Sequence, residues 1–432
     1  MHYATFAIVL LALLSVALAV QPDEANADTP DLTSNAQLVV PRQGLGNFFA
    51  KVHAGKPVTV AYFGGSITAA NGWRVQTQQW LTKQYPQAKF TEVHAAIGGT
   101  GSNLGAFRCQ HDVLQYKPDL IFVEFAVNDG GDAPESIWRQ MEGIVRQIWR
   151  ANPETDICYV YTFKVGYEDA LKAGHNPRAA AADEKLADFY GIPSINVALE
   201  TVNRAEAGKL IYVPKKDADG KVLPTPDGVT LFSNDSVHPL DAGHQIYTQV
   251  ITDALKQMEP MPAVGKRTLK EPFIVGNWEQ AKQVPLQPSM LSAGWKKLAA
   301  DDAVGKYFFN RMSEIWQGDK PGETIMFKFK GTSARLYDLM GPDAGQAIVT
   351  VDNKPPFNVS RFDKYCTYHR LATLVFGEGM PDTVHTVKIE ISPVQPDRTP
   401  ASSGEKGTFD PKKYDGTVIR TGAILLIGDI VD

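Results

Sequence analysis

The chain has 432 residues, of which 44% are hydrophobic and 10% aromatic, so it can form more than one buried core. Its formal net charge is −5, and charged residues make up 21% of the chain. This mild acidity excludes a basic surface for nucleic acid and gives no strong attraction to membranes. Neutral or weakly polar ligands fit such a composition better than polyanions do.

The first residues predict export. Ala4–Ala17 is an almost unbroken apolar run, and the small residues Ala17 and Ala19 suit cleavage of a signal peptide before the polar segment that begins at Gln21. The run is shorter than the ~20 residues that cross a bilayer. We therefore expect a signal peptide at 1–19, a secreted or periplasmic location, and no stable membrane insertion after cleavage. An uncleaved N-terminal anchor is the alternative.

The cysteine content excludes a fully paired disulfide framework, because the chain has only Cys109, Cys158 and Cys366. A bridge between Cys109 and Cys158 is one interpretation, and small buried thiols are the other. The Cys and His residues do not have the spacing of a zinc site, and we expect neither a metal nor a cofactor.

Short apolar runs alternate with helical stretches up to Met258. Five of these runs are apolar on both faces and predict buried strands of a parallel sheet: Val58–Phe63, Phe90–Ala95, Asp119–Ala126, Asp156–Phe163 and Pro193–Val197. Helices are predicted over Pro134–Arg150, after an Asn176–Pro177 cap as far as Gly191, and over Leu240–Met258. Strict alternation implies a doubly wound α/β sandwich with right-handed crossovers.

The composition changes after Met258, where Pro260, Pro262 and Gly265 indicate a linker. Alternating apolar and polar residues then predict strands at Thr324–Lys330, Gln346–Asp352, His385–Ile391 and Ala423–Val431. Short strands separated by Gly, Pro and Asp turns are typical of an antiparallel β-sandwich. The predicted organisation is a signal peptide at 1–19, a lead-in segment at 20–45, an α/β domain at 46–258, a linker at 259–270 and a β-sandwich domain at 271–432.

Glycine-rich segments follow the first two predicted strands, at the edge where open α/β sheets bind ligands. Phe63–Thr68 presents Ser66 where a helix begins, so the Ser66 N–H could meet a developing negative charge. An ordinary strand–helix connection is the alternative. Ala96–Ser102 could supply a second donor, the Gly99 N–H. A phosphate-binding loop or a plain turn is the alternative here, but a dinucleotide fold would need a glycine where Leu104 stands.

The third predicted strand leads into Ala126–Gly131, which contains Asn128 and Asp129. The neutral amide of Asn128 could donate to an oxyanion without adding a charge that would retain the product carboxylate. We expect Asp129 to cap or brace the loop. The alternative interpretation of the whole segment is an Asx turn that ends the strand.

A fourth segment, Ser233–Pro239, opens the last predicted helix and places Asp235 three residues before His238. The carboxylate can receive the Nδ1–H of the histidine while Nε2 faces Ser66, which fixes the tautomer and stabilises the imidazolium that forms during attack. The other eight histidines, His244 included, are interpreted as structural.

Together, the four segments resemble those of the SGNH (GDSL-type) hydrolase superfamily, over about Val58–Met258. The resemblance implies a three-layer, flavodoxin-like sandwich with a parallel sheet, followed here by a jelly-roll-like antiparallel β-sandwich. One position departs from the family pattern, because Gly65 stands before the serine where the family usually has Asp.

The resemblance also implies a role for each site residue. Ser66 would be the nucleophile, His238 the base and Asp235 the carboxylate that orients the base. The oxyanion hole would consist of the Ser66 N–H, Gly99 and Asn128.

Bacterial enzymes of this superfamily that carry a β-sandwich resemble this layout, and many of them remove acetyl groups from polysaccharides. We therefore expect a serine esterase that removes O-acetyl groups from oligo- or polysaccharides through an acyl-enzyme intermediate, with an acetylated carbohydrate as its partner. A lipase or thioesterase, or an O-acetyltransferase, would use the same triad. A carbohydrate-binding protein with a degenerate hydrolase domain is the alternative from another class.

Three features bear on the substrate. Trp278, Trp295 and Trp316 could stack on sugars, although a tryptophan in a small β-domain usually lies in the core. The polar connection Glu200–Leu231 could act as a lid or substrate wall, or be a surface loop. Asn234-Asp-Ser236 is a glycosylation sequon, and a glycan there would crowd the site, so we expect maturation without it, as in a bacterium.

Overall fold

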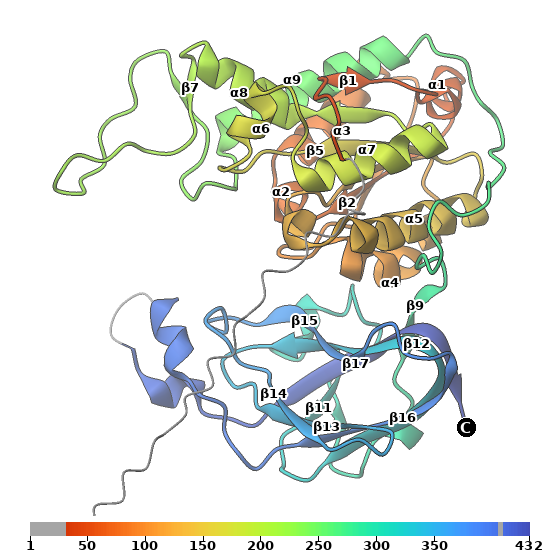
Figure 1. Ribbon diagram of the computed structural model, residues 1–432, viewed down its shortest axis with the longest axis vertical. Coiled ribbons are helices and arrows are strands. Elements are labelled where there is room, and N and C mark those ends of the chain that lie inside the picture. The colour runs from red at the N-terminus through yellow and green to blue at the C-terminus, as the bar shows by residue number, and fades with distance from the viewer. Residues whose placement is uncertain (1–31, 405–408) are drawn as a thin grey trace, which may run out of the picture. The chain divides into compact units, whose positions relative to one another are not determined.

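The computed structural model describes residues 32–404 and 409–432 (Figure 1). The predicted signal peptide at 1–19, and the lead-in segment before residue 32, lie outside these described residues. Residues Thr33–Asp432 form one compact unit. Within the described residues there is no helix long and apolar enough to cross a membrane. The domain boundaries at 46–258 and 271–432 remain predictions.

The first sheet has the strand order β1-β6-β5-β4-β2-β3. Its five parallel strands occupy the predicted positions: β2 (Val58–Gly64), β3 (Phe90–His94), β4 (Leu120–Glu124), β5 (Asp156–Tyr161) and β6 (Ser194–Asn196). The short strand β1 (Val39–Val40) adds an antiparallel edge beside β6, which the sequence did not predict. The sheet is therefore mixed, with β4 and β5 buried along their whole length.

Helices cover both faces of this sheet (Figure 1). On one face lie α4 (Ser102–Asp112), α5 (Pro134–Ala151) and α7 (Arg178–Tyr190), and on the other lie α1 (Gly46–His53), α3 (Trp73–Gln84), α8 (Val197–Glu206) and α9 (Asp241–Met258). The predicted apolar stripe of α5 is buried along its length, at Ile137, Met141, Ile144, Val145 and Ile148. Because helices bury both faces of the sheet, the side chains on both faces of its central strands are apolar. These strands therefore appear in the sequence as continuous apolar runs.

The start of α7 differs from the prediction that Asn176 caps it. Pro177 occupies the cap position, and no side chain caps the helix. The Asn176 side chain instead donates to Ser34 Oγ at 2.9 Å and accepts a hydrogen bond from Asn196 Nδ2 at 2.8 Å. It is therefore used to join β6 to the segment before β1. Gly191 ends the helix in the left-handed conformation, as its position predicted.

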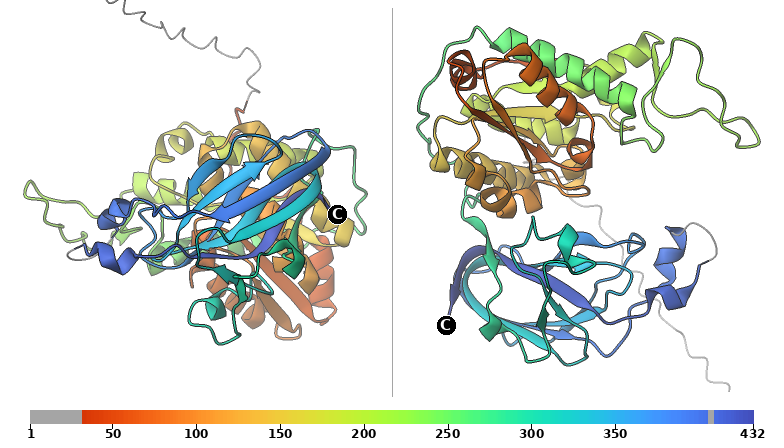
Figure 2. Two further views of the ribbon diagram at one scale, coloured as in Figure 1. Left: turned by 90° about the horizontal axis from the view of Figure 1, so that it is seen from below. Right: turned by 180° about the vertical axis from the view of Figure 1, so that it is seen from behind.

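The connection predicted as a lid or loop contains a small parallel pair, β7 (Leu210–Ile211) and β8 (Thr230–Leu231). Residues 212–229 extend away from the sheet and its helices in all views (Figures 1 and 2). This segment belongs to the connection that enters the loop of Asp235 and His238.

The described residues of the second half form an antiparallel β-sandwich (Figure 2), in which nine strands are assigned. Its strands are β9 (Ala281–Pro285), β10 (Lys296–Lys297), β11 (Trp316–Gly318), β12 (Thr324–Met340), β13 (Gln346–Val351), β14 (Phe357–Ser360), β15 (Arg370–Gly377), β16 (Thr383–Ile391) and β17 (Ile419–Val431). Strand β12 pairs with β16 along its first half and with β15 along its second half, so it connects the two layers. The narrower description as a jelly roll remains a prediction.

Strand β12 continues to Met340, whereas the sequence predicted an end at Lys330. Register shifts occur between Gly331 and Ser333 and between Tyr337 and Asp338. Beyond Gly331 the strand is buried on both faces for most of its length. The alternation of polar and apolar residues that identifies a half-buried strand is therefore lost there.

The three tryptophans of the second half are buried or half-buried. Trp295 is buried in the core of the sandwich, and Trp316 lies half-buried against that core. The Trp278 ring packs on Phe107 of α4, with ring centroids 5.3 Å apart. These contacts favour packing over sugar stacking as the role of all three side chains.

The three cysteines are buried free thiols in the structure. Cys109 and Cys158 are therefore not bridged in the structure, which agrees with the interpretation of both as small buried thiols. Burial raises the pKa of both thiols well above its usual range.

Arg267 fastens the segment after α9 to the amino end of β5. Its Nη2 donates to Asp156 Oδ1 at 2.6 Å, and its Nη1 donates to the Thr155 carbonyl at 3.2 Å. The Asp156 side chain is 0% exposed and also accepts the Phe48 N–H at 2.8 Å. An ionised carboxylate at this depth depends on its cationic partner.

We expect Arg267→Met to lower the free energy of unfolding by about 3 kcal/mol, because it leaves the buried Asp156 without a charge partner. Urea unfolding of the wild type and the variant would measure this loss. Equal unfolding midpoints would show that the pair contributes nothing to stability.

Candidate active site

Ser66 lies at the carboxyl end of β2, as the first residue of the short helix α2 (Ser66–Ala69). The turn before it is joined to both neighbouring strands. Ile97, after β3, donates its N–H to the Gly64 carbonyl at 3.0 Å, and the Gly65 N–H donates to the Glu124 carbonyl of β4 at 3.2 Å. Three of the predicted segments therefore meet at one edge of the sheet.

Ser66, His238 and Asp235 form a hydrogen-bonded line. His238 Nε2 lies 2.7 Å from Ser66 Oγ, and His238 Nδ1 lies 2.7 Å from Asp235 Oδ2. The histidine and carboxylate side chains are 47% and 55% exposed, so substrate and water can reach them. When Nδ1–H donates to the carboxylate, Nε2 is left as the acceptor for the serine hydroxyl.

The Asp235 carboxylate is held in place by hydrogen bonds from its own loop. Its Oδ1 accepts the backbone N–H groups of His238 at 2.8 Å and Val237 at 3.0 Å, and the Ser233 hydroxyl at 3.0 Å. Burial acts to raise the pKa of Asp235, but the hydrogen bonds from His238, Val237 and Ser233 outweigh it and hold that pKa well below its usual range. The group is therefore an anion that faces the histidine.

The loop between the carboxylate and the histidine is strained. Ser236 has a φ of +77°, a conformation that side chains other than glycine seldom adopt. The Ser236 carbonyl accepts the Val165 N–H at 2.8 Å, which ties this loop to the segment after β5. These contacts keep Asp235 and His238 in one fixed relation.

The three predicted oxyanion donors surround the serine. The Ser66 N–H begins α2 and has no partner inside that helix. A Cβ on Gly98 would lie 3.6 Å from Ser66 Cβ, so the loop that carries Gly99 passes directly beside the serine. Gly99 has a φ of +72°, and among the described residues its N–H has no acceptor. The Asn128 side chain is exposed and lies against Gly65.

The structure explains why Gly65 replaces the aspartate that is usual in the family. A Cβ at Gly65 would lie 2.1 Å from Asn128 Oδ1 and 3.3 Å from the Thr100 carbonyl. The Asn128 amide therefore occupies the space that any side chain at position 65 would need. The glycine is required by this close approach rather than by its backbone angles, since its φ is −91°.

A buried carboxyl group lies beneath the serine turn, and the sequence analysis did not identify it. Glu124 is 1% exposed, and its carboxyl accepts hydrogen bonds from Thr68 at 2.7 Å and Thr162 at 2.9 Å. Burial raises the pKa of Glu124 to about 7, against the opposing effect of these hydroxyl donors. A single acidic residue inside the apolar strand β4 is the signal that could have revealed it.

Asp129 braces the loop, in the way that its position predicted. Its Oδ1 accepts the Ser102 N–H at 2.9 Å, which is at the start of α4. Burial raises the pKa of Asp129 to about 7, although the hydrogen bonds from Ser102 lower it. His244 is a buried residue whose Nδ1 accepts the Trp73 N–H at 3.3 Å, in agreement with a structural role.

The site geometry does not include a metal-binding cluster. Within residues 32–404 and 409–432, no group of three or more His, Cys, Asp or Glu side chains could hold a metal ion. The arrangement of a hydroxyl, an imidazole, a carboxylate and free N–H donors can carry out nucleophilic acyl transfer.

Sequence comparison finds one family model that matches part of the chain. The model of the GDSL-like Lipase/Acylhydrolase family matches residues 62–246, which include every predicted site residue. A comparison with curated proteins gives no match.

Two solved structures share the fold over most of the chain. A two-domain esterase active on acetylated mannans, co-crystallised with mannopentaose, aligns with a TM-score of 0.66 and 20% identity and covers 89% of this chain and 94% of that one. A second structure, of a two-domain esterase active on acetylated mannans, aligns with a TM-score of 0.64 and 20% identity over 87% of this chain and 93% of that one. The order of an α/β domain and a β-sandwich is thus shared.

We expect the unfolding free energy of the wild type to fall between pH 5 and 8, because folded Glu124 holds its proton to about pH 7, well above its ordinary pKa of 4.5. Glu124→Gln removes the part of this loss that Glu124 contributes, on the order of 3 kcal/mol, while Asp129, whose pKa is also raised to about 7, still contributes. Urea unfolding at both pH values would measure the effect, with the exposed Glu206→Gln as the control. An equal change of the unfolding free energy between pH 5 and 8 in the wild type and in Glu124→Gln would contradict a raised pKa of Glu124.

Proposed function

We propose that this chain, whose residues 62–246 belong to the GDSL-like Lipase/Acylhydrolase family, is a secreted serine esterase that removes O-acetyl groups from carbohydrates, with acetylated mannan as the first substrate to test. The observation that carries the proposal is the line of 2.7 Å contacts from Asp235 through His238 to Ser66. A serine hydroxyl becomes a nucleophile at neutral pH when an oriented base takes its proton.

The proposed reaction has two steps. Ser66 Oγ attacks the acetyl carbonyl carbon while His238 Nε2 takes the hydroxyl proton, and the tetrahedral intermediate expels the sugar oxygen, which receives that proton. Water then attacks the acetyl-serine with His238 again as the base, and acetate leaves. Asp235 stabilises the imidazolium during both steps.

The negative charge of the intermediate would be met by three neutral donors. These are the N–H groups of Ser66 and Gly99 and the amide of Asn128, and each such donor is worth about 3 kcal/mol of barrier. Neutral donors suit an acyl transfer that ends in release of a carboxylate, because they do not hold the product by charge.

A short acyl group on a polymer fits the surroundings of the site. Gly98, Gly99, Asn128 and His238 are all exposed, so the site is open to a large polar molecule. Among the described residues, the exposed large apolar side chains in the loops joined to the site are Val165 and, in the connection that enters the Asp235 loop, Val222 and Leu223. A long acyl chain would need an extended apolar groove, which disfavours a lipase or thioesterase.

Support for the mannan class comes from the two structures above, both of a two-domain esterase (CEX) active on acetylated mannans, whose two-domain arrangement this chain shares. Because these structures are 20% identical to this chain, they support acetylated mannan only as the first substrate to test. Export, by cleavage of the apolar segment at 1–19, is part of the proposal, because polymers of this kind lie outside the cell. We also propose that Asn234 carries no glycan in the mature protein.

We expect the enzyme to release acetate from acetylated manno-oligosaccharides, and Ser66→Ala to lose this activity by roughly 10⁴-fold or more. Mass spectrometry of the oligosaccharides would measure deacetylation, with octanoyl esters testing the lipase and free sugar acceptors testing acetyl transfer. Unchanged activity in Ser66→Ala would refute the nucleophile. Faster hydrolysis of octanoyl than of acetyl esters would favour a lipase or thioesterase, and net transfer of acetyl groups to free sugar would favour an O-acetyltransferase. Binding of the oligosaccharide without turnover would favour a degenerate hydrolase.

A second prediction concerns Gly65. We expect Gly65→Ala to lower kcat about 10²-fold, because the added Cβ displaces the Asn128 amide and removes one oxyanion donor. The matched control is Gly131→Ala in the Asn128 loop, where a Cβ meets no atom within 4 Å. Hydrolysis of p-nitrophenyl acetate by both variants would measure the effect. Equal kcat values in Gly65→Ala and Gly131→Ala would show that catalysis does not depend on the packing of the Asn128 amide against Gly65.

A further inference from the structure

The segment that leads to the Gly99 loop runs along an edge of the sheet. In the part of the chain that the structure describes, strand β3 pairs only with β2, so one side of its backbone has no neighbouring strand there. The Ala95 N–H donates to the Tyr62 carbonyl of β2 at 3.0 Å, which directs Ala95 towards the sheet. His94 and Ala96 therefore direct their carbonyl groups to the open side. Free edge carbonyls need a donor from elsewhere in the fold.

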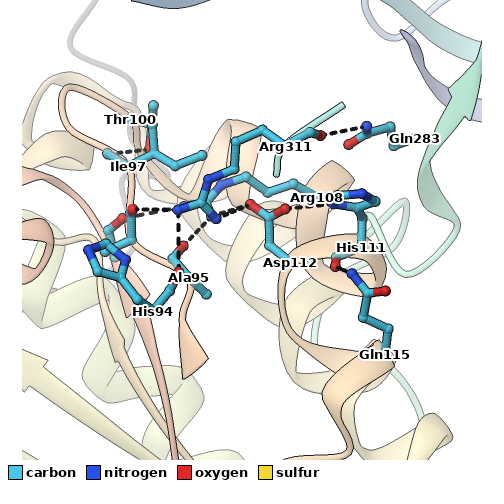
Figure 3. Close-up of polar contacts among 12 residues, drawn as sticks. His94, Ala95, Ile97, Thr100, Arg108, His111, Asp112, Gln115, Gln283 and Arg311 are labelled. Atoms are coloured by element: carbon cyan, nitrogen blue, oxygen red, sulfur yellow. Dashed lines mark hydrogen bonds and ion pairs between the residues drawn. The ribbon is translucent and has the colours of Figure 1, made fainter. Parts of the chain in front are cut away.

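An arginine of the β-sandwich half supplies this donor (Figure 3). Arg311 Nη2 donates to the His94 carbonyl at 3.3 Å and to the Ala96 carbonyl at 3.2 Å. Its Nη1 donates to Asp112 Oδ2 of α4 at 3.1 Å. The Arg311 side chain is 12% exposed, and its bonds to Ala96 and Asp112 are partly buried, whereas the bond to His94 is exposed.

A second arginine holds the inner side of the same backbone. Arg108, which is 0% exposed, donates to the Ala95 carbonyl and, at 3.3 Å, to the Gly64 carbonyl in the serine turn. It also donates to Asp112 Oδ2 at 2.9 Å, so one carboxylate joins both guanidinium groups. Figure 3 shows the two arginines reaching this carboxylate and the strand end together.

The position of Arg311 is fixed by the sandwich half of the chain. Its N–H donates to the Phe308 carbonyl at 2.8 Å, after the turn Gly305–Tyr307. Its carbonyl accepts a hydrogen bond from Gln283 of β9 at 3.0 Å. The guanidinium is therefore presented by a turn and a strand rather than by a free loop.

The backbone segment that the two arginines hold ends at Ala96, three residues before Gly99. From Ala96 the chain passes through Ile97, whose N–H binds the Gly64 carbonyl and whose carbonyl accepts the Thr100 hydroxyl at 2.8 Å. Among the described residues the Gly99 N–H has no hydrogen bond of its own to fix it, so its direction depends on these anchors. A shift of about 1 Å in such a donor can cost about 10²-fold in rate.

We propose that Arg311 is a positioning residue for the oxyanion hole, so that the C-terminal β-sandwich completes the active site of the α/β half. The guanidinium holds His94 and Ala96 from the open side while Arg108 holds Ala95 from the sheet side. The inference rests on the esterase function proposed above.

The test compares Arg311→Met with Arg267→Met. Both changes remove an arginine that donates to a backbone carbonyl and to a buried aspartate, but Arg267 lies at the amino end of β5, away from the serine edge. The readouts are kcat and KM for p-nitrophenyl acetate and hydrogen–deuterium exchange of the Ala95 and Ile97 amides.

For Arg311→Met we expect a loss of kcat of roughly tenfold with KM unchanged, and faster exchange at both amides. Arg267→Met should retain wild-type kcat and exchange, and Arg311→Lys should lie between the wild type and Arg311→Met. The inference is overturned if Arg311→Met keeps the wild-type kcat and the wild-type amide exchange. It is also overturned if kcat falls as much in Arg267→Met as in Arg311→Met. If Arg311→Met does not fold, the same readouts on Arg311→Lys decide. A wild type inactive on acetyl esters would refute the proposed function, while exchange would still decide the role of Arg311.

Discussion

The account depends on one contact, the 2.7 Å separation of Ser66 Oγ and His238 Nε2, which joins residues 172 positions apart. A serine hydroxyl attacks an ester at neutral pH only when a base at this distance receives its proton. The serine follows β2 and the histidine precedes α9, so most of the α/β sandwich lies between them in sequence. Any shift of the helix against the sheet would break this contact.

Buried polar groups prevent that shift. Glu124 binds hydroxyls from the turns after β2 and β5, Asp129 binds the start of α4, and Arg108 binds carbonyls at the ends of β2 and β3. Each of these groups makes most of its hydrogen bonds to segments at the carboxyl edge of the sheet, although among the described residues Arg108 Nε and Asp129 Oδ2 have no partner. A buried polar network of this kind favours one arrangement of those segments, because any other would leave more buried polar groups without partners.

Local patterns predicted the five parallel strands and the segments of Ser66, Gly99, Asn128 and Asp235–His238, because apolar runs and turn residues are short-range signals. Strand β1 was missed because two residues give no periodicity, and the second half of β12 because both its faces are buried. Arg311 could not be predicted, since its partner Asp112 lies 199 positions away and neither residue belongs to a motif. Asn176 was predicted as a helix cap, but its side chain bonds to distant Ser34 and Asn196.

The most direct measurement is the site of labelling by a fluorophosphonate, which transfers its phosphonyl group to an activated serine oxygen with loss of fluoride. Peptide mapping of the labelled protein should find the adduct on Ser66, and His238→Ala should abolish labelling, because the hydroxyl then has no base. An adduct on another residue, or equal labelling of Ser66 without the histidine, would contradict the account.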